Sequence, residues 1–150
     1  MGVLIDASTL IEAERGRLVL EQHVAQRQNE EFFLSVITMS ELLHGVHRAV
    51  QAEVRTKRAA FVEAILDRFP LLSVDSATAR THAQVWAELA AAGQMIGPHD
   101  LWLAATCIAH GLRVHARISS DFRRSSTSLD CVAREEQLSS RRKPLSCKTF

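Results

Sequence analysis

The sequence predicts an α/β protein of three layers, α/β/α, in which helices cover both faces of a central, mostly parallel sheet. Short, continuously apolar runs alternate along the chain with longer segments of helical periodicity. Alternating strands and helices form βαβ units, and strands without polar alternation are typical of sheets covered on both faces. The chain has 150 residues, 47% of them hydrophobic, which suffices for the core of one domain.

The predicted strands are short apolar runs that end at a turn or capping residue. They comprise residues 2–6, 32–36, 71–74 and 113–116, the last being the weakest pattern. After residue 122 the pattern degrades into segments rich in Ser and Arg. We therefore expect one domain over residues 1–124 and a tail over residues 125–150, with room for one edge strand at 129–132 and otherwise disordered.

The first four predicted helices follow from periodicity and capping residues. Ser8 opens a helix that ends near Gly16, and residues 18–29 form a second, loosely periodic helix. Thr38 stands three residues before Glu41, the spacing of a capping box, which predicts a helix start at Thr38. Residues 55–69 carry apolar side chains at helical spacing, and Pro70 ends that helix.

Two more helices are predicted toward the end of the domain. Asp75 or Ser76 caps a helix that runs to about Gly93. Its inward residues are expected to be Ala79, Ala83, Trp86, Leu89 and Ala90. The dipeptide at 97–98, Gly-Pro, begins the last helix, which is apolar almost all round over residues 101–108 and ends at Gly111.

Composition excludes several classes of protein. No apolar run approaches the roughly 20 residues of a membrane span, and no basic segment precedes the apolar start of the chain. The three cysteines are widely spaced, which favours a reducing cytoplasm over a disulfide framework. Residues 1–112 carry 9 Lys and Arg against 13 Asp and Glu, whereas residues 113–150 carry 9 against 4. This basic end is compatible with a nucleic-acid partner and equally with a solvated tail.

Four carboxylates stand where ligands bind in α/β proteins, at the carboxyl ends of strands. Asp6 ends the first strand, Glu41 lies one turn beyond the second, Asp100 lies in the first turn of the last helix, and Asp121 follows the last strand. Clustered carboxylates repel one another unless a cation neutralises them, and their oxygens are hard ligands for Mg²⁺ or Mn²⁺. We therefore expect a divalent-cation site there.

Each carboxylate also has a structural alternative. Asp6 is suited to a helix N-cap, and Glu41 to the capping box with Thr38. Asp100 is suited to the helix dipole, and Asp121 to an exposed loop. Other chemistries find less support, because the sequence lacks a phosphate-cradling glycine loop and a GxSxG elbow, and the pair His44 and His47 lacks a third metal ligand.

Three stretches of the sequence together resemble the PIN (PilT N-terminus) domain, and in particular the VapC-type toxin ribonucleases of toxin–antitoxin pairs. They are residues 4–8 (LIDAS), 40–46 (SELLHGV) and 96–105 (IGPHDLWLAA). The resemblance covers about four-fifths of the chain, from residue 3 to residue 122. It implies that Asp6, Glu41 and Asp100 are the catalytic acids, that Asp6 and Asp100 bind metal, and that Ser8 supports Asp6 by a hydrogen bond.

The resemblance also implies function and partners. The expected activity is Mg²⁺- or Mn²⁺-dependent endonucleolytic hydrolysis of RNA, with tRNA or rRNA as the substrate. The expected assembly is a homodimer bound by a cognate antitoxin in the cytoplasm, with no membrane association. Five arginines are candidates to position phosphates: Arg15, Arg48, Arg117, Arg123 and Arg124.

The fourth motif of the family is matched in part. Asp121 and Phe122 fit the acid–Phe pair, which makes Asp121 the fourth catalytic acid, but Ile118 stands where the family places a polar residue. This departure motivates an alternative, a catalytically impaired PIN-like module that binds RNA or protein. A nuclease acting on single-stranded DNA is a third hypothesis.

Overall fold

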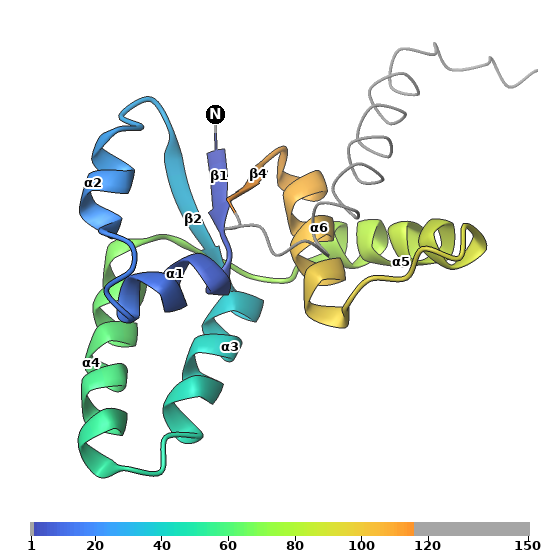
Figure 1. Ribbon diagram of the computed structural model, residues 1–150. Helices are drawn as coiled ribbons and strands as arrows, with labels where there is room; N and C mark the ends of the chain where they lie inside the picture. The colour runs from blue at the N-terminus through green and yellow to red at the C-terminus, as the bar shows by residue number, and fades with distance from the viewer. Residues whose placement is uncertain (1, 116–150) are drawn as a thin grey trace, which may run out of the picture. The chain divides into compact units, whose positions relative to one another are not determined.

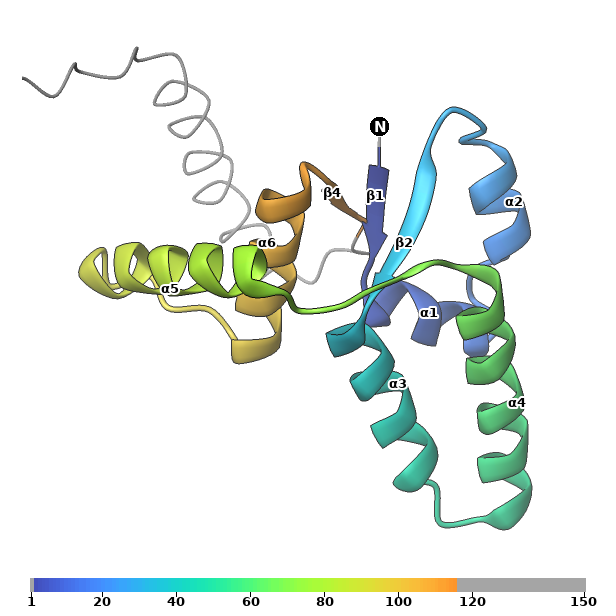
Figure 2. The ribbon, with the colours of Figure 1, turned by 180° about the vertical axis from the view of Figure 1, so that it is seen from behind.

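The computed structural model describes residues 2–115 and confirms the predicted three-layer fold. Along the chain the elements are β1 (Gly2–Ile5), α1 (Ala7–Glu14), α2 (Leu20–Ala25), β2 (Glu31–Ser35), α3 (Val36–His47), α4 (Ala52–Arg68), β3 (Leu71–Leu72), α5 (Ser76–Ala91), α6 (Pro98–His110) and β4 (Arg113–His115). Figures 1 and 2 show them from opposite sides. No helix in this part of the chain is both long enough and apolar enough to span a membrane.

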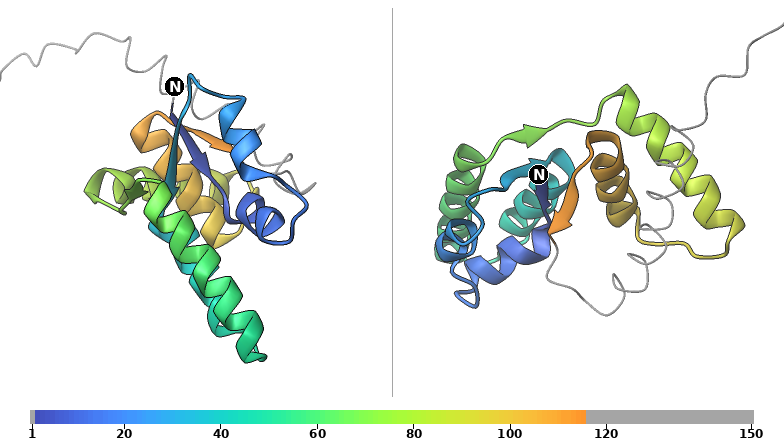
Figure 3. Two further views of the ribbon diagram at one scale, coloured as in Figure 1. Left: turned by 90° about the vertical axis from the view of Figure 1, so that its left-hand side faces the viewer. Right: turned by 90° about the horizontal axis from the view of Figure 1, so that it is seen from above.

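The four strands form one parallel sheet in the order β3-β2-β1-β4. β1 therefore lies inside the sheet, with Leu4 paired to Phe33 of β2 and to Val114 of β4. Because all strands run the same way, the carboxyl ends of β1, β2 and β4 lie at one edge. Seen from above, α1 to α4 lie on one side of the strands, and α5 and α6 lie on the other (Figure 3).

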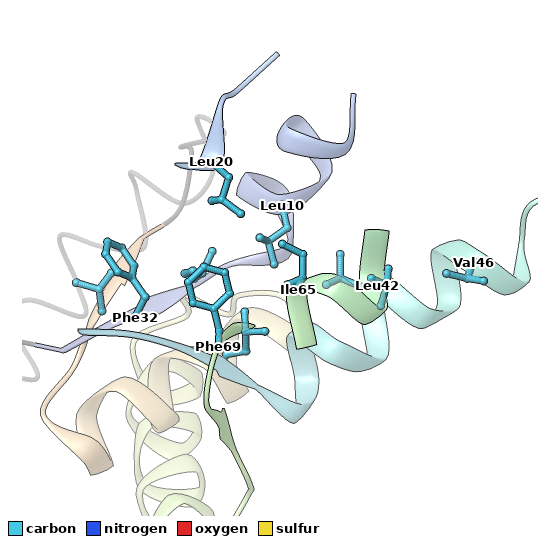
Figure 4. Close-up of a cluster of buried hydrophobic side chains, with 11 residues drawn as sticks. Leu10, Leu20, Phe32, Leu42, Val46, Ile65 and Phe69 are labelled. Atoms are coloured by element: carbon cyan, nitrogen blue, oxygen red, sulfur yellow. The ribbon is translucent and has the colours of Figure 1, made fainter. Parts of the chain in front are cut away.

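The larger part of the core lies between the sheet and α1 to α4. Val3, Ile5 and Leu34 point to this side and are 1–3% exposed or fully buried. Helix residues close the cluster, among them Leu10, Leu20, Leu42, Val46, Ile65 and Phe69 (Figure 4). Successive side chains of β1 point to opposite faces of the sheet. Leu4 therefore packs on the other side, against Leu103 and Cys107 of α6.

α5 packs mainly against α6, and its predicted inward face was largely wrong. Leu89 is buried as predicted, but Ala79, Ala83, Trp86 and Ala90 are exposed. The buried residues of this helix are instead Thr78, Val85 and Leu89. The prediction followed residue size, whereas the buried face of the helix is the one that packs against α6. Asp75 caps the helix by accepting a hydrogen bond from the Thr78 backbone.

Three helix boundaries differ from the predictions. α3 begins at Val36, because Ser35 rather than Thr38 is its N-cap and accepts a hydrogen bond from the Thr38 backbone at 2.9 Å. α2 is shorter than the predicted 18–29, and α4 begins three residues earlier than predicted, at Ala52. The predicted domain boundary at 124/125, the tail with its edge strand, and residues 118 and 121 lie outside the described residues.

Candidate metal centre

Asp6 follows β1 directly and is the N-cap of α1. The Ser8 hydroxyl donates a hydrogen bond to Asp6 Oδ2 at 2.5 Å, and the Ser8 backbone N–H donates to the same oxygen at 3.3 Å. Both bonds end on one oxygen, so they fix the carboxylate and do not engage Oδ1. The capping role considered for Asp6 is therefore real, and it is compatible with a ligand role for the second oxygen.

Asp100 lies in the first turn of α6, where its side chain is partly buried. Burial and the negative charge of Asp6 both raise the pKa of the Asp100 carboxyl, whereas neighbouring His99 lowers it. The two acids thus come from opposite ends of the domain and lie close enough for their charges to interact. This proximity agrees with the sequence-based expectation for the pair.

The Asp100 carboxylate folds back over the first turn of α6. A Cβ atom built on Gly97, the N-cap of that helix, would lie only 3.1 Å from Asp100 Oδ2. Gly97 thus leaves the space that this carboxylate fills. The sequence predicted Gly97 as a helix start, but the contact of Gly97 with Asp100 was not predicted.

Glu41 is held by a residue that the sequence analysis did not single out. His99 Nδ1 and Glu41 Oε1 form a hydrogen bond of 2.8 Å between α6 and α3. The predicted capping box of Thr38 and Glu41 is wrong, because the N-cap of α3 is Ser35, three residues before Thr38, and Glu41 lies in the second turn. Glu41 is therefore tied to the neighbour of Asp100 rather than to the start of its own helix. The place of His99 next to Asp100 was the only sequence signal for this contact.

The described residues do not enclose a metal ion by themselves. Within residues 2–115, no three His, Cys, Asp or Glu side chains are gathered closely enough to do so. Asp121, the fourth expected acid, lies outside this range. The described residues therefore contain a pair of interacting carboxylates, Asp6 and Asp100, and a Glu41 side chain hydrogen-bonded to His99, which precedes Asp100 in the sequence.

A pocket of about 570 Å³ opens next to Glu41, between α1, α3 and α4. It is lined by Ile11, Glu14, Arg15, Ser40, Glu41, Leu42, His44, Gly45, Arg48, Arg58, Val62 and His99. Two of the five arginines expected to position phosphates, Arg15 and Arg48, therefore line the same pocket as Glu41. The other three, at positions 117, 123 and 124, lie outside the described residues.

These features define a parallel α/β protein with an acidic site at the carboxyl edge of its sheet. The chain belongs to the PIN domain family, whose sequence profile matches residues 3–125. It is 34% identical over 126 residues to ribonuclease VapC1 of Rickettsia felis, covering 83% of this chain and 90% of that protein. It is 28% identical over 124 residues to the tRNA(fMet)-specific endonuclease VapC of Salmonella typhimurium, covering 81% of this chain and 89% of that protein.

Solved structures agree with the fold. The VapBC-5 toxin–antitoxin structure from Mycobacterium tuberculosis matches with a TM-score of 0.65 and 28% identity, over 81% of this chain and 88% of that chain. The structure of VapBC2 from Rickettsia felis, bound to a DNA fragment from its promoter, matches with a TM-score of 0.73. The match covers 83% of this chain and 92% of that chain. At 18% identity, that second match supports the fold alone.

Proposed function

We propose that this chain is a Mg²⁺-dependent endoribonuclease and the toxin of a type II toxin–antitoxin pair. Family membership and the naming of its relatives as VapC ribonucleases support this proposal. The observation that carries it is the proximity of Asp6 and Asp100, whose charges repel while hydrogen bonds from Ser8 fix the Asp6 carboxylate. Such a pair is a stable arrangement when a cation lies between the two charges.

The donor set fits Mg²⁺ or Mn²⁺. Mg²⁺ prefers oxygen ligands, retains several waters and is commonly bound by one or two carboxylates together with substrate phosphates. Asp6 and Asp100 supply two such carboxylates, with Oδ1 of Asp6 free of the Ser8 hydrogen bonds. When bound, the ion polarises a phosphate and lowers the pKa of a bound water.

The residues of the chain then have separate tasks. Ser8 fixes the Asp6 carboxylate in one rotamer, so that ligand binding need not order it. His99 holds Glu41 by a hydrogen bond, and both residues line the pocket. Glu41 is the residue proposed to orient the attacking water or to accept a proton from it. Asp121 is proposed as the fourth acid of the site.

The proposal extends to the partners. The VapBC-5 structure, which shares 28% identity with this chain, belongs to a toxin–antitoxin system, and this supports a cognate antitoxin for the chain. One relative is named as specific for tRNA(fMet), so tRNA is the first substrate to test, followed by rRNA. A homodimer and a cytoplasmic location complete the proposal.

The test is cleavage of total cellular tRNA and rRNA by the purified chain, with and without Mg²⁺. We expect cleavage that EDTA abolishes and that Asp6→Asn lowers by about a thousandfold or more, because the variant loses a charged ligand. Asp67→Asn, an exposed acid on α4, is the matched control and should cleave normally. Full activity in Asp6→Asn would refute the assignment.

The same experiment separates the alternatives. An RNA-binding or protein-binding module without activity would retain its ligand in EDTA, cut no RNA, and show no Mn²⁺ binding by calorimetry at about millimolar metal. A preference for single-stranded DNA over RNA would identify the third hypothesis.

A further inference from the structure

We propose that the pocket between α1, α3 and α4 binds backbone phosphates of the RNA strand through Arg15 and Arg48. This inference rests on the proposed ribonuclease function and adds to the acid pair a separate, cationic site for the same substrate. An acidic cleft repels RNA wherever its charges are not neutralised, so a nearby cationic site would supply the attraction that the acids lack.

The pocket extends along α3, from Glu41 to Arg48 at the end of that helix. Seven residues separate positions 41 and 48, so the helix rises by about 10 Å between them. Asp6 and Asp100 do not line the pocket, and its link to them is His99, which lines it and precedes Asp100 in the sequence. An RNA strand bound in this pocket would therefore be held through residues other than the acid pair.

The exposed side chains of the pocket lining are polar or cationic, namely Arg15, Ser40, His44, Arg48 and His99. Its apolar residues Leu42 and Val62 are only 4% and 1% exposed, because they belong to the core. The pocket surface as a whole is nevertheless more apolar than polar. The charge that would attract phosphate groups therefore comes from the two exposed arginines, whose side chains donate hydrogen bonds.

The acids of the pocket are already paired, whereas two of its arginines are not. Arg58 donates to Glu14 Oε1 at 2.7 Å and to the Gly45 carbonyl at 2.8 Å, and His99 engages Glu41. Among residues 2–115, neither Arg15 nor Arg48 takes part in an ion pair. Both guanidinium groups are thus available to an anion, and arginine is well suited to phosphate because its planar fork donates two parallel hydrogen bonds.

A purely structural role must be separated from binding. Arg15 is the C-cap of α1 and Arg48 is the C-cap of α3, where a cation interacts favourably with the helix dipole. Both helices consequently end at the same pocket. If capping were the whole role, removing these charges would lower the melting temperature and leave RNA affinity unchanged.

The test is RNA binding without cleavage. All variants are made in an Asp100→Asn background and measured in EDTA by fluorescence anisotropy with a short, labelled, single-stranded RNA of mixed sequence. We expect R15Q/R48Q to bind about tenfold more weakly and the slope of log affinity against log salt to become shallower by about 1.4, at about 0.7 per lost phosphate contact. R15K/R48K should retain most of the affinity. Arg80→Gln, an exposed arginine on α5 outside the pocket, is the control and should bind normally.

The outcomes distinguish this inference from the proposed function. Unchanged RNA affinity and salt slope in R15Q/R48Q would overturn the phosphate site, whether or not the unmodified chain cleaves RNA. Absence of cleavage by the unmodified chain would overturn the ribonuclease proposal and leave the binding result intact. If an oligoglutamate peptide bound more tightly than RNA, and did so only with both arginines present, the pocket would be a site for an acidic protein segment and the phosphate proposal would be wrong.

Discussion

Replacing Gly97 by alanine would show how closely the position of the Asp100 carboxylate controls the site. The added Cβ would lie 3.1 Å from Asp100 Oδ2 and 3.8 Å from Cγ, whereas ordinary contacts begin at 3.4 Å. The carboxylate must therefore move by about 0.3 Å. The backbone can accept alanine, because Gly97 has φ −58° and ψ 147°, which any L-residue adopts. The variant should thus fold normally with one acid displaced.

The expected effect is on metal binding and catalysis rather than on stability. A misplacement of about 1 Å can cost about a hundredfold in rate, so a displacement of about 0.3 Å should lower Mn²⁺ affinity and kcat/KM by about threefold to fivefold. The free energy of unfolding should change by less than about 1 kcal/mol, because the entropy gain of Gly→Ala opposes the poorer N-cap.

Gly45→Ala is the matched control for Gly97→Ala. The Cβ atom of this variant would meet Arg58 Cδ at 3.8 Å, an ordinary contact inside α3. It should stabilise the fold by about 0.5–1 kcal/mol and leave Mn²⁺ affinity unchanged. Calorimetry measures the Mn²⁺ affinity, single-turnover cleavage measures the rate of RNA hydrolysis, and thermal melting measures the stability of the fold. If Gly97→Ala bound Mn²⁺ as tightly as the unmodified chain and cleaved RNA as fast, the contact between Gly97 and Asp100 would have no role in the site.

Two further predictions concern the acid pair. Ser8→Ala removes the hydroxyl hydrogen bond to Asp6 but keeps the backbone hydrogen bond, so Mn²⁺ affinity should fall by about 10- to 100-fold. Calorimetric titration with Mn²⁺ measures this, with Ser73→Ala, an exposed serine, as the control. An Mn²⁺ affinity that does not change in Ser8→Ala would contradict the prediction. Burial and the Asp6 charge raise the pKa of Asp100 above its ordinary 3.8, so in EDTA this group should destabilise the fold progressively as pH rises through and above that value. Denaturant titrations should therefore show Asp100→Asn gaining stability over the unmodified chain between about pH 4 and 7. If the difference in the free energy of unfolding between the two proteins did not grow with pH, burial and the Asp6 charge would not destabilise the ionised Asp100.

Much of the fold was predictable because hydrophobic periodicity and caps act locally. The apolar run of β1 indicated a strand covered on both faces, and Gly111, with φ 63°, ends α6 where predicted. α5 was predicted poorly, because its alanines are small enough to be either buried or exposed. Which face is buried depended on the packing of α6, which a single helical segment does not encode.

The candidate site was predictable in composition but not in connectivity. Asp6 and Asp100 could be identified because each acid lies at a strand end or helix start. The link between His99 and Glu41 could not be predicted, because it joins two helices that are distant in the sequence. Likewise, Thr38 resembled a cap in sequence, but Ser35 took that role and Thr38 instead donates to the Ile5 carbonyl at the end of β1.

Topology explains why the acids meet at one edge. α1 and α3 follow β1 and β2, so both helices begin at the carboxyl end of the sheet. α6 precedes β4, and a helix that leads into a parallel strand runs back along the sheet, so its N-terminus lies at the same edge. Asp6 and Asp100 therefore converge through the strand order, with β1 between β2 and β4, rather than through their separation in sequence. The buried core between the sheet and α1 to α4 stabilises the strand order, and through it the fold holds the two like charges near each other.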